Sequence, residues 1–148
     1  MALQGFTESL AGKWLLVKNE GFDEYLQAMG VGYIKRKLAL SFNTTMEMIK
    51  EGEDSIRIIT KSAKNMDTVI KIDEEKEEAD PFDNKIKVKV SWDPATKVLK
   101  TESYPLEGSN AKTALVERKI LPDGQMLMEV TLPNDNLVCK RYFQKQDS

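Results

Sequence analysis

The sequence predicts a mainly β fold, an antiparallel barrel or sandwich with a helical segment near its start. Apolar residues recur at every second position in several short segments, and short turns separate these segments. After the first of them, the apolar spacing changes to that of a helix. At 148 residues, we expect one domain over residues 1–148, with a core that needs no disulfide or metal. A closed barrel is favoured because it leaves no strand edge exposed.

The chain begins with an expected strand and continues into helices. Residues 13–17 (Lys-Trp-Leu-Leu-Val) form an apolar run of the β type. Residues 21–30 carry four apolar side chains on one helix face, namely Phe22, Tyr25, Leu26 and Met29. Gly30 and Gly32 are typical of a helix C-terminus. A second short helix is expected over about residues 33–40.

Short strands with a period of two fill the middle of the chain. Their apolar positions are Met46, Met48, Ile56, Ile58, Ile86, Val88 and Val90. A turn is expected at residues 52–54, and residues 69–71 predict a further strand. The acidic stretch at residues 73–81 predicts a solvated turn or a strand edge. Lysines alternate with the apolar residues of segment 85–90, which predicts an antiparallel strand with one solvated face.

The last third of the chain predicts a hairpin and a closing strand. Residues 114–121 and 125–132 are two strand-like segments. The Asp123-Gly124 pair between them is a hairpin signal, because these residues adopt positive φ readily. The closing strand is expected over residues 137–144.

The composition excludes several classes of function. Lys and Arg number 22 and Asp and Glu number 24, so a net charge of -2 argues against nucleic acid as a partner. The sequence has no histidine, the commonest general base and metal ligand, and its single cysteine, Cys139, cannot form an internal disulfide. No nucleophile elbow, phosphate loop or metal-ligand spacing is present. We therefore expect no enzyme, no cofactor and no metal site.

Hydropathy bears on the location of the protein. No apolar run is long enough to span a bilayer. The first ten residues lack the basic and apolar regions of a secretory signal peptide. Together with the lone cysteine, these features predict a cytoplasmic protein.

Two strands near the end of the chain carry an arginine on their apolar face. In the last strand one face carries Leu137, Cys139, Arg141 and Phe143. In the strand before the Asp123-Gly124 turn, one face carries Ala114, Val116, Arg118 and Ile120. An arginine inside a barrel is costly unless an anion meets it, and neither strand offers an inward carboxylate nearby. Arg118 and Arg141 therefore predict a site for a ligand carboxylate, which a guanidinium binds in bidentate fashion.

A simpler interpretation of the two arginines stays open at this point. Either side chain can reach solvent after a β-bulge, or extend to the rim of the barrel. The methionines add a weaker indication, since Met46, Met48, Met126 and Met128 occur with a period of two. Methionine adapts to flexible alkyl chains, although ordinary core packing explains the same pattern.

Two groups of motifs resemble one known family. The first is Gly12-Lys13-Trp14, then Phe22-Asp23-Glu24-Tyr25-Leu26, Gly30-Val31-Gly32 and Arg36-Lys37. The second is Val138-Cys139-Lys140-Arg141-Tyr142-Phe143. In this order they resemble the intracellular fatty-acid-binding proteins, the cytosolic branch of the lipocalin-like lipid carriers. The resemblance extends from Phe6 to Lys145.

The resemblance implies a fold and a set of site residues. The fold is a ten-stranded antiparallel up-and-down β-barrel, a β-clam, with a helix-turn-helix lid after the first strand. Arg141 matches the family's carboxylate-binding arginine, and Arg118 matches the second, with Lys119 as its competitor because the loop at Pro122 is longer. The positions that match the family's ligand pocket are Phe22, Leu26, Val31, Lys35, Met46, Met48, Val116, Met128, Val130 and Phe143.

Phe143 departs from the family pattern, which has a tyrosine at this position. One hydroxyl donor to the ligand carboxylate is then missing, at a cost of about 1.5–3 kcal/mol if nothing replaces it. Tyr142 is expected to point outward. A water molecule or another polar side chain is expected to take over the missing hydrogen bond.

The resemblance implies non-covalent binding and intracellular transport of a long-chain fatty acid by a monomer. Retinoic acid or another lipid acid, with ligand-dependent delivery to the nucleus, is the alternative, whereas retinol is disfavoured because glutamines tend to replace the arginines in its carriers. Ligand entry is expected near Leu26, Val31 and Ala63. The basic cluster Lys35, Arg36 and Lys37 predicts transient contact with anionic membranes or nuclear import, or is simply a solvated helix face.

Overall fold

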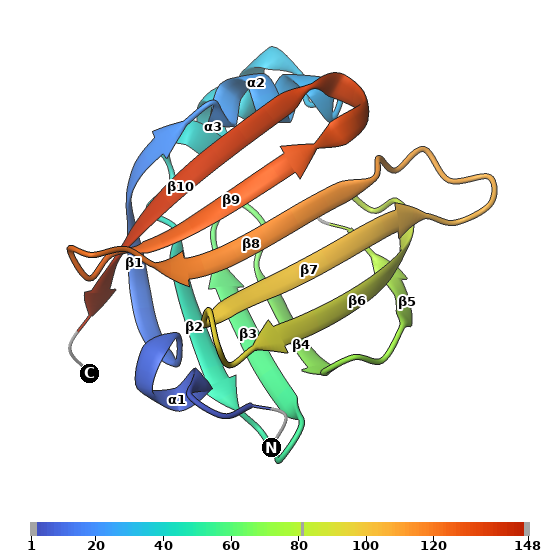
Figure 1. Cartoon of the computed structure of the whole chain (residues 1–148). Helices are drawn as coiled ribbons and strands as arrows, with labels where there is room; N and C mark the ends of the chain where they lie inside the picture. The colour runs from blue at the N-terminus through green and yellow to red at the C-terminus, as the bar shows by residue number, and fades with distance from the viewer. Residues whose placement is uncertain (1–2, 81, 147–148) are drawn as a thin grey trace.

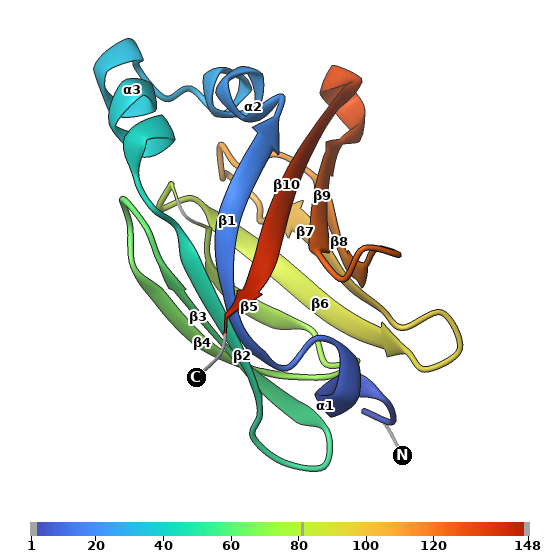
Figure 2. The ribbon, with the colours of Figure 1, turned by 90° about the vertical axis from the view of Figure 1, so that its left-hand side faces the viewer.

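The computed structural model describes residues 3–80 and 82–146, which form one ten-stranded antiparallel sheet curled into a barrel (Figures 1 and 2). Its strands are β1 (Gly12–Glu20), β2 (Thr45–Lys50), β3 (Ser55–Lys61), β4 (Met66–Lys71), β5 (Lys76–Ala79), β6 (Lys85–Asp93), β7 (Val98–Pro105), β8 (Ala114–Ile120), β9 (Met126–Leu132) and β10 (Leu137–Gln146). The helices are α1 (Phe6–Ser9), α2 (Phe22–Ala28) and α3 (Tyr33–Ser41), with a 3₁₀ turn at Pro133–Asp135. The expected barrel with two helices after its first strand is confirmed.

The sheet runs in the order β4-β3-β2-β1-β10-β9-β8-β7-β6-β5. Every pair except β1–β10 joins strands that are neighbours in sequence, so the topology is up-and-down. The expectation that no strand edge remains is wrong, because β4 and β5 are the two edges of the sheet. Lys76 spans the seam between them, donating from Nζ to the carbonyl of Val69 at 3.3 Å. The acidic stretch is thus an edge strand and its turns, as expected.

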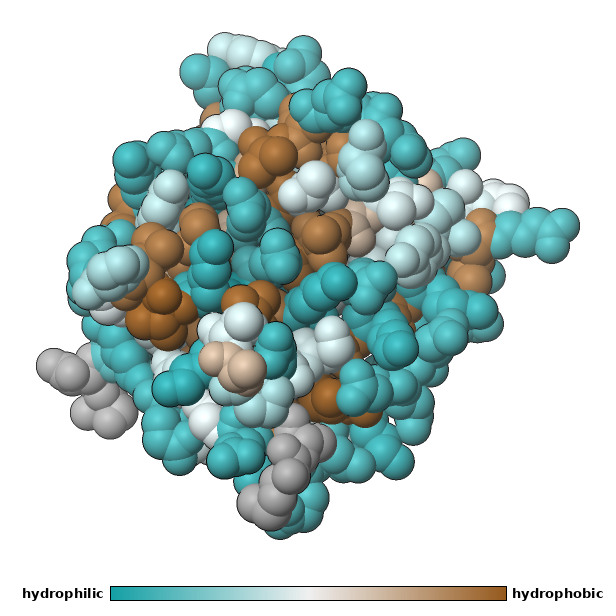
Figure 3. Space-filling model, in the orientation of Figure 1, coloured by the Kyte–Doolittle hydropathy of each residue, from teal (hydrophilic) through white to brown (hydrophobic). Residues whose placement is uncertain are grey.

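Alternation along the strands separates the core from the surface as the sequence predicts. In β6, Ile86, Val88 and Val90 are buried, and the lysines between them are exposed. The Asp123-Gly124 turn joins β8 to β9, with Gly124 at a φ of 89° that suits glycine. Over β7 to β10, the outer face in Figure 3 is mostly hydrophilic with small apolar areas between.

One end of the barrel is closed by packing that the sequence analysis missed. Helix α1 is only four residues long, and its buried Phe6 meets the ring of Trp92 edge-on at a centroid distance of 5.5 Å. The indole nitrogen of Trp92 donates to the carbonyl of Gln4 at 2.7 Å. Trp14, also buried, donates to the carbonyl of Leu10 at 3.0 Å. These aromatic residues fill the end of the barrel near α1.

The opposite end is covered by α2 and α3, which lie side by side in both ribbon views. Arg36 ties the two helices together, donating to Asp23 Oδ1 at 3.0 Å and to the carbonyl of Val31 at 2.8 Å. Apart from this contact, α3 packs loosely, since none of its residues is buried. Within the described residues, no helix combines the length and apolar character needed to cross a bilayer.

Candidate functional site

A cavity of about 350 Å³ lies inside the barrel, between the core and α2. This volume falls within the range of small-molecule sites. Of the twelve predicted site residues, eight line the cavity, namely Phe22, Leu26, Met46, Val116, Arg118, Met128, Val130 and Arg141. These residues come from α2 and from strands β2, β8, β9 and β10, so the fold brings together positions far apart in the sequence.

The other four predicted site residues lie elsewhere. Met48 and Phe143 are fully buried in the main core, away from the cavity lining. Val31 packs against the cluster formed by α2 and the strands beneath it. Lys35 is exposed on α3. For Met48, Phe143, Val31 and Lys35, a direct ligand contact therefore remains a prediction without support from the shape of the cavity.

Arg118 is a buried charged group on the cavity wall. Its side chain extends inward from β8, and 8% of the residue is exposed. Its Nε atom has no hydrogen-bond partner among the described residues. Burial, with a smaller contribution from the nearby charge of Arg141, lowers the pKa of Arg118 to about 10, which still leaves it protonated at neutral pH. The competitor Lys119 is exposed on the other face of β8.

Arg141 extends into the same cavity from β10. Its Nε donates to Asn19 Oδ1 at 3.0 Å, and its guanidinium lies 4.0 Å from the ring centroid of Phe22 in α2. This stacking on an aromatic ring holds the guanidinium plane in place. Burial lowers the pKa of Arg141 from its ordinary value. Arg141 thus links the polar end of the cavity to the helical lid.

The strand register explains why both arginines share one site. Arg118 on β8 and Arg141 on β10 are both paired with Met128 on the intervening strand β9. Paired residues in a sheet point to the same face, so all three side chains enter the cavity from neighbouring positions of its wall. Tyr142 points outward, as expected, and its hydroxyl donates to Glu20 Oε2 at 3.0 Å.

Tyr25 is a cavity residue that the sequence analysis assigned only to a helix face. It lines the cavity from α2 and stacks on Phe22 with a centroid distance of 6.2 Å. Burial raises the pKa of Tyr25 to about 12, while the positive charge of Arg141 acts in the opposite direction. The phenol therefore stays protonated and close to Arg141, where it can donate a hydrogen bond. A helical period cannot reveal this proximity, because it depends on how α2 sits on the barrel.

Two carboxyl groups also line the cavity and were not singled out by the sequence. Asp80 is buried and accepts hydrogen bonds from the backbone nitrogens of Phe82 and Asn84 at 2.8 and 2.9 Å, so it organises the turn after β5. Glu78 extends inward from β5, and burial raises its pKa. The acidic character of this stretch had suggested only solvation.

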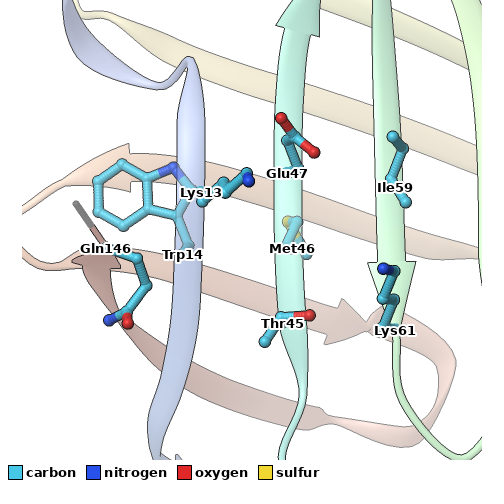
Figure 4. A pocket seen from close by; sticks show the side chains of 8 residues that line it. All are labelled: Lys13, Trp14, Thr45, Met46, Glu47, Ile59, Lys61 and Gln146. Carbon is cyan, nitrogen blue, oxygen red and sulfur yellow. The ribbon is translucent and has the colours of Figure 1, made fainter. Parts of the chain in front are cut away.

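A second hollow of about 310 Å³ lies at strands β1, β2 and β3 (Figure 4). Besides Trp14 and Met46, it is bordered by side chains that alternate with the buried ones, including Lys13, Glu47 and Lys61. Its lining mixes both charges, whereas the internal cavity is lined mainly by apolar side chains. Metal ligands are not gathered anywhere in the described residues, where no group of three or more His, Cys, Asp or Glu side chains is placed to hold an ion.

Comparison with known proteins agrees with the fold. Residues 11–146 match the model of the lipocalin / cytosolic fatty-acid binding protein family. The chain is 31% identical over 142 residues to human fatty acid-binding protein 12, covering 95% of this chain and 94% of that protein. It is 28% identical over 141 residues to rat cellular retinoic acid-binding protein 2, covering 93% and 99%.

Solved structures give the same result. The REP1-NXSQ fatty acid transporter superposes with a TM-score of 0.79 at 30% identity, covering 94% of this chain and 97% of that one. Lipid binding protein 8 of Caenorhabditis elegans superposes with a TM-score of 0.83 at 26% identity, covering 98% and 100%. The matched segment, the ten-stranded barrel and the relatives together establish that this chain belongs to the lipocalin / cytosolic fatty-acid binding protein family.

Proposed function

We propose that this protein reversibly binds and carries a long-chain fatty acid, whose carboxylate is held by Arg118 and Arg141. The observation that carries the proposal is the buried Arg118, whose Nε has no partner and which faces the same apolar cavity as Arg141. A buried cation without an internal partner is expensive, and a bound carboxylate removes that cost. Membership of a lipid-binding family supports the same conclusion.

The driving force of binding is the transfer of the alkyl chain from water. Each buried methylene contributes about 0.8 kcal/mol, and the lining of Leu26, Met46, Val116 and Val130 supplies the apolar surface. The hydroxyl of Tyr25 replaces the one that is missing at Phe143, because it is protonated and close to Arg141. Cavity water bridges polar groups that the ligand does not reach.

Ligand entry is proposed beside α2, where two turns meet the lid. Phe82, in the turn after β5, lies 6.3 Å from Tyr25 between ring centroids. Lys64, in the turn after β3, forms an ion pair with Asp83 at 2.8 Å. Leu26 and Ala63 line the cavity at this end, whereas Val31 packs beside it. Separation of these turns from α2 opens a path to Arg118.

Retinoic acid is the alternative ligand of the same site. It shares the carboxylate and the apolar body of a fatty acid, and the names of the similar proteins include both ligands. Purifying the protein under native conditions and identifying the bound lipid by mass spectrometry decides between them. Equal displacement of a fluorescent fatty acid by oleic acid and by oleyl alcohol would contradict recognition of a carboxylate.

A second activity, contact with anionic membranes during transfer, is favoured by the surface of α3. Ile34 is 82% exposed and Leu38 is 55% exposed, one helical turn apart. Lys35 and Lys37 are exposed beside them, whereas Arg36 is engaged with Asp23. Apolar residues flanked by lysines are typical of helices that lie on anionic bilayers.

We further propose that the protein acts as a monomeric carrier in the cytoplasm and not as an enzyme. The cavity offers a cation pair and hydroxyls for binding, and its thiol, Cys139, has a pKa raised by burial to about 11, which makes it a poor nucleophile. Nuclear delivery is the alternative fate, for which the exposed Lys35 and Lys37 are the candidate signal. Imaging the protein with and without added fatty acid tests it.

A further inference from the structure

Two buried side-chain nitrogen or oxygen atoms among the described residues lack a hydrogen-bond partner, Arg118 Nε and Glu78 Oε1. Both residues line the same cavity. Their charges are opposite, yet they are not partners of one another. The neighbouring charge that shifts the pKa of Arg118 is that of Arg141, and the neighbouring charge that shifts the pKa of Glu78 is that of Lys76. No ion pair within 4.0 Å joins Glu78 to an arginine in the described chain.

The strand register separates the two residues within the sheet. Arg118 is paired with Leu99 on β7, which is paired with Trp92 on β6. Glu78 is paired with Ile86, six residues before Trp92 on the same strand. Six residues of strand span about 20 Å. β5 is also three strands away from β8 in the sheet (Figure 1), so Arg118 and Glu78 enter the cavity from different parts of its wall, and a molecule that meets both needs two separate polar groups.

The surroundings of Glu78 specify what it lacks. Burial raises the pKa of Glu78, and the positive charge of Lys76 lowers it by a smaller amount. Lys76 donates its own hydrogen bond to the carbonyl of Val69. Lys76 therefore supplies a positive charge near the Glu78 carboxylate, whereas the buried Oε1 atom has no hydrogen-bond donor. A neutral O–H group meets that need without bringing a second cation to a place that already has one.

From these positions we infer that the cavity is built for a fatty acid that carries a hydroxyl group on its chain, away from the carboxylate. The carboxylate meets Arg118 and Arg141, and the hydroxyl donates to Glu78 Oε1. This inference rests on the proposed function, since it assigns a second polar contact of the same ligand. An unsubstituted fatty acid leaves Glu78 buried without a donor from the ligand, which costs affinity.

The experiment compares matched pairs of acids in displacement of a fluorescent fatty acid. Oleic and ricinoleic acids differ by one hydroxyl in mid-chain, and palmitic and ω-hydroxypalmitic acids differ by one at the chain end. The wild type should prefer at least one hydroxylated member about tenfold, the effect of one hydrogen bond to a charged group. Glu78→Val should abolish that preference.

The control variant is Glu77→Val, one residue away on the same edge strand. Glu77 is exposed and is paired with the outward Lys87, so its replacement should leave the preference intact. Equal binding of both members of each pair by the wild type overturns the inference, and so does a preference that survives in Glu78→Val. Failure of oleic and palmitic acids to bind at all overturns the proposed function itself, so the two failures are distinguishable.

Discussion

Arg118 and Arg141 flank Met128 in the strand register and lie two strands apart. Their Cα atoms are separated by about 10 Å, since neighbouring strands lie ~4.8 Å apart. Their charges repel, and this repulsion is one cause of the lowered pKa of Arg118. Two cations held together in an apolar interior favour an anion between them, and this relationship underlies the first two predictions.

Removing either inward guanidinium should weaken fatty-acid binding. Arg118→Gln or Arg141→Gln should lower the affinity by about 10- to 150-fold, because a hydrogen bond to a charged group contributes about 1.5–3 kcal/mol. Displacement of a fluorescent fatty acid measures the change. Lys119→Gln, on the outer face of the same strand as Arg118, should bind like the wild type. A loss as large in Lys119→Gln as in Arg118→Gln would show that general charge, and not the cavity, attracts the ligand.

Arg118, whose buried Nε has no hydrogen-bond partner in the described chain, should also reduce the stability of the empty protein. Arg118→Met should raise the free energy of unfolding by about 1–4 kcal/mol, as replacement of buried charge by apolar side chains often does. Urea unfolding without ligand measures this, and Lys119→Met, which is exposed, should change it by less than about 0.5 kcal/mol. A destabilised Arg118→Met would mean that Arg118 is already compensated inside the protein.

Glu78 should make stability fall as pH rises. Its pKa in the folded protein lies above the ordinary 4.5, because burial disfavours the charged form. The folded state therefore binds this proton more tightly than the unfolded state, and the resulting stabilisation is lost as pH rises through the folded pKa. Glu78→Gln should have a higher melting temperature than the wild type near neutral pH, and the difference in melting temperature should shrink well below pH 4.5. Glu77→Gln serves as the control, and an equal difference at both pH values would contradict the prediction.

The ion pair between Lys64 and Asp83 should slow ligand release. It joins the turns after β3 and β5 next to the cavity, and Lys64 itself lines the cavity. An exposed pair contributes about 0.2–1 kcal/mol, so Asp83→Asn should raise the dissociation rate by ~1.5- to 5-fold at low salt. Stopped-flow release of a fluorescent fatty acid measures the rate. High salt should remove the difference by screening.

The control for that ion pair breaks a pair of the same kind on the barrel wall. Asp67→Asn removes the ion pair between Arg57 on β3 and Asp67 on β4, in which the guanidinium donates to the two carboxylate oxygens at 2.8 and 2.6 Å. It should leave the dissociation rate unchanged. If both variants accelerate release equally, the effect belongs to general loosening of the barrel and not to the turns beside α2.

The exposed face of α3 should affect the rate of fatty-acid transfer to membranes and not the equilibrium affinity for the fatty acid. Ile34→Ser and Leu38→Ser should leave stability within about 0.5 kcal/mol and equilibrium affinity unchanged, because both side chains are exposed. Transfer of a fluorescent fatty acid to anionic vesicles should slow. Val138→Ser, at an exposed apolar position on β10, is the matched control. Transfer rates that depend only on ligand release, and not on vesicle concentration, would argue against contact.

Much of the fold is predictable because local patterns reflect burial directly. The alternation in β6, the helical spacing of Phe22 and Leu26, and the Asp123-Gly124 turn each require only neighbouring residues. Helix α1 is too short to show a period, and β5 consists of charged and small residues whose pairing depends on β6. The ten-strand count and the lid came from the resemblance to a family and not from the patterns.

The alternation of residues was enough to predict that Arg118 and Arg141 lie on the apolar faces of their strands, since side-chain direction along a strand follows from position. The three-dimensional structure was needed to show that both arginines are paired with Met128, that Tyr25 and Arg141 contact the same Phe22 ring, and that Phe143 and Met48 are buried outside the observed cavity lining. It also turned Glu78 from a residue of an acidic surface stretch into part of the cavity wall. The physical reason is that register between strands, and the seating of a helix on a barrel, depend on contacts between segments far apart in the chain.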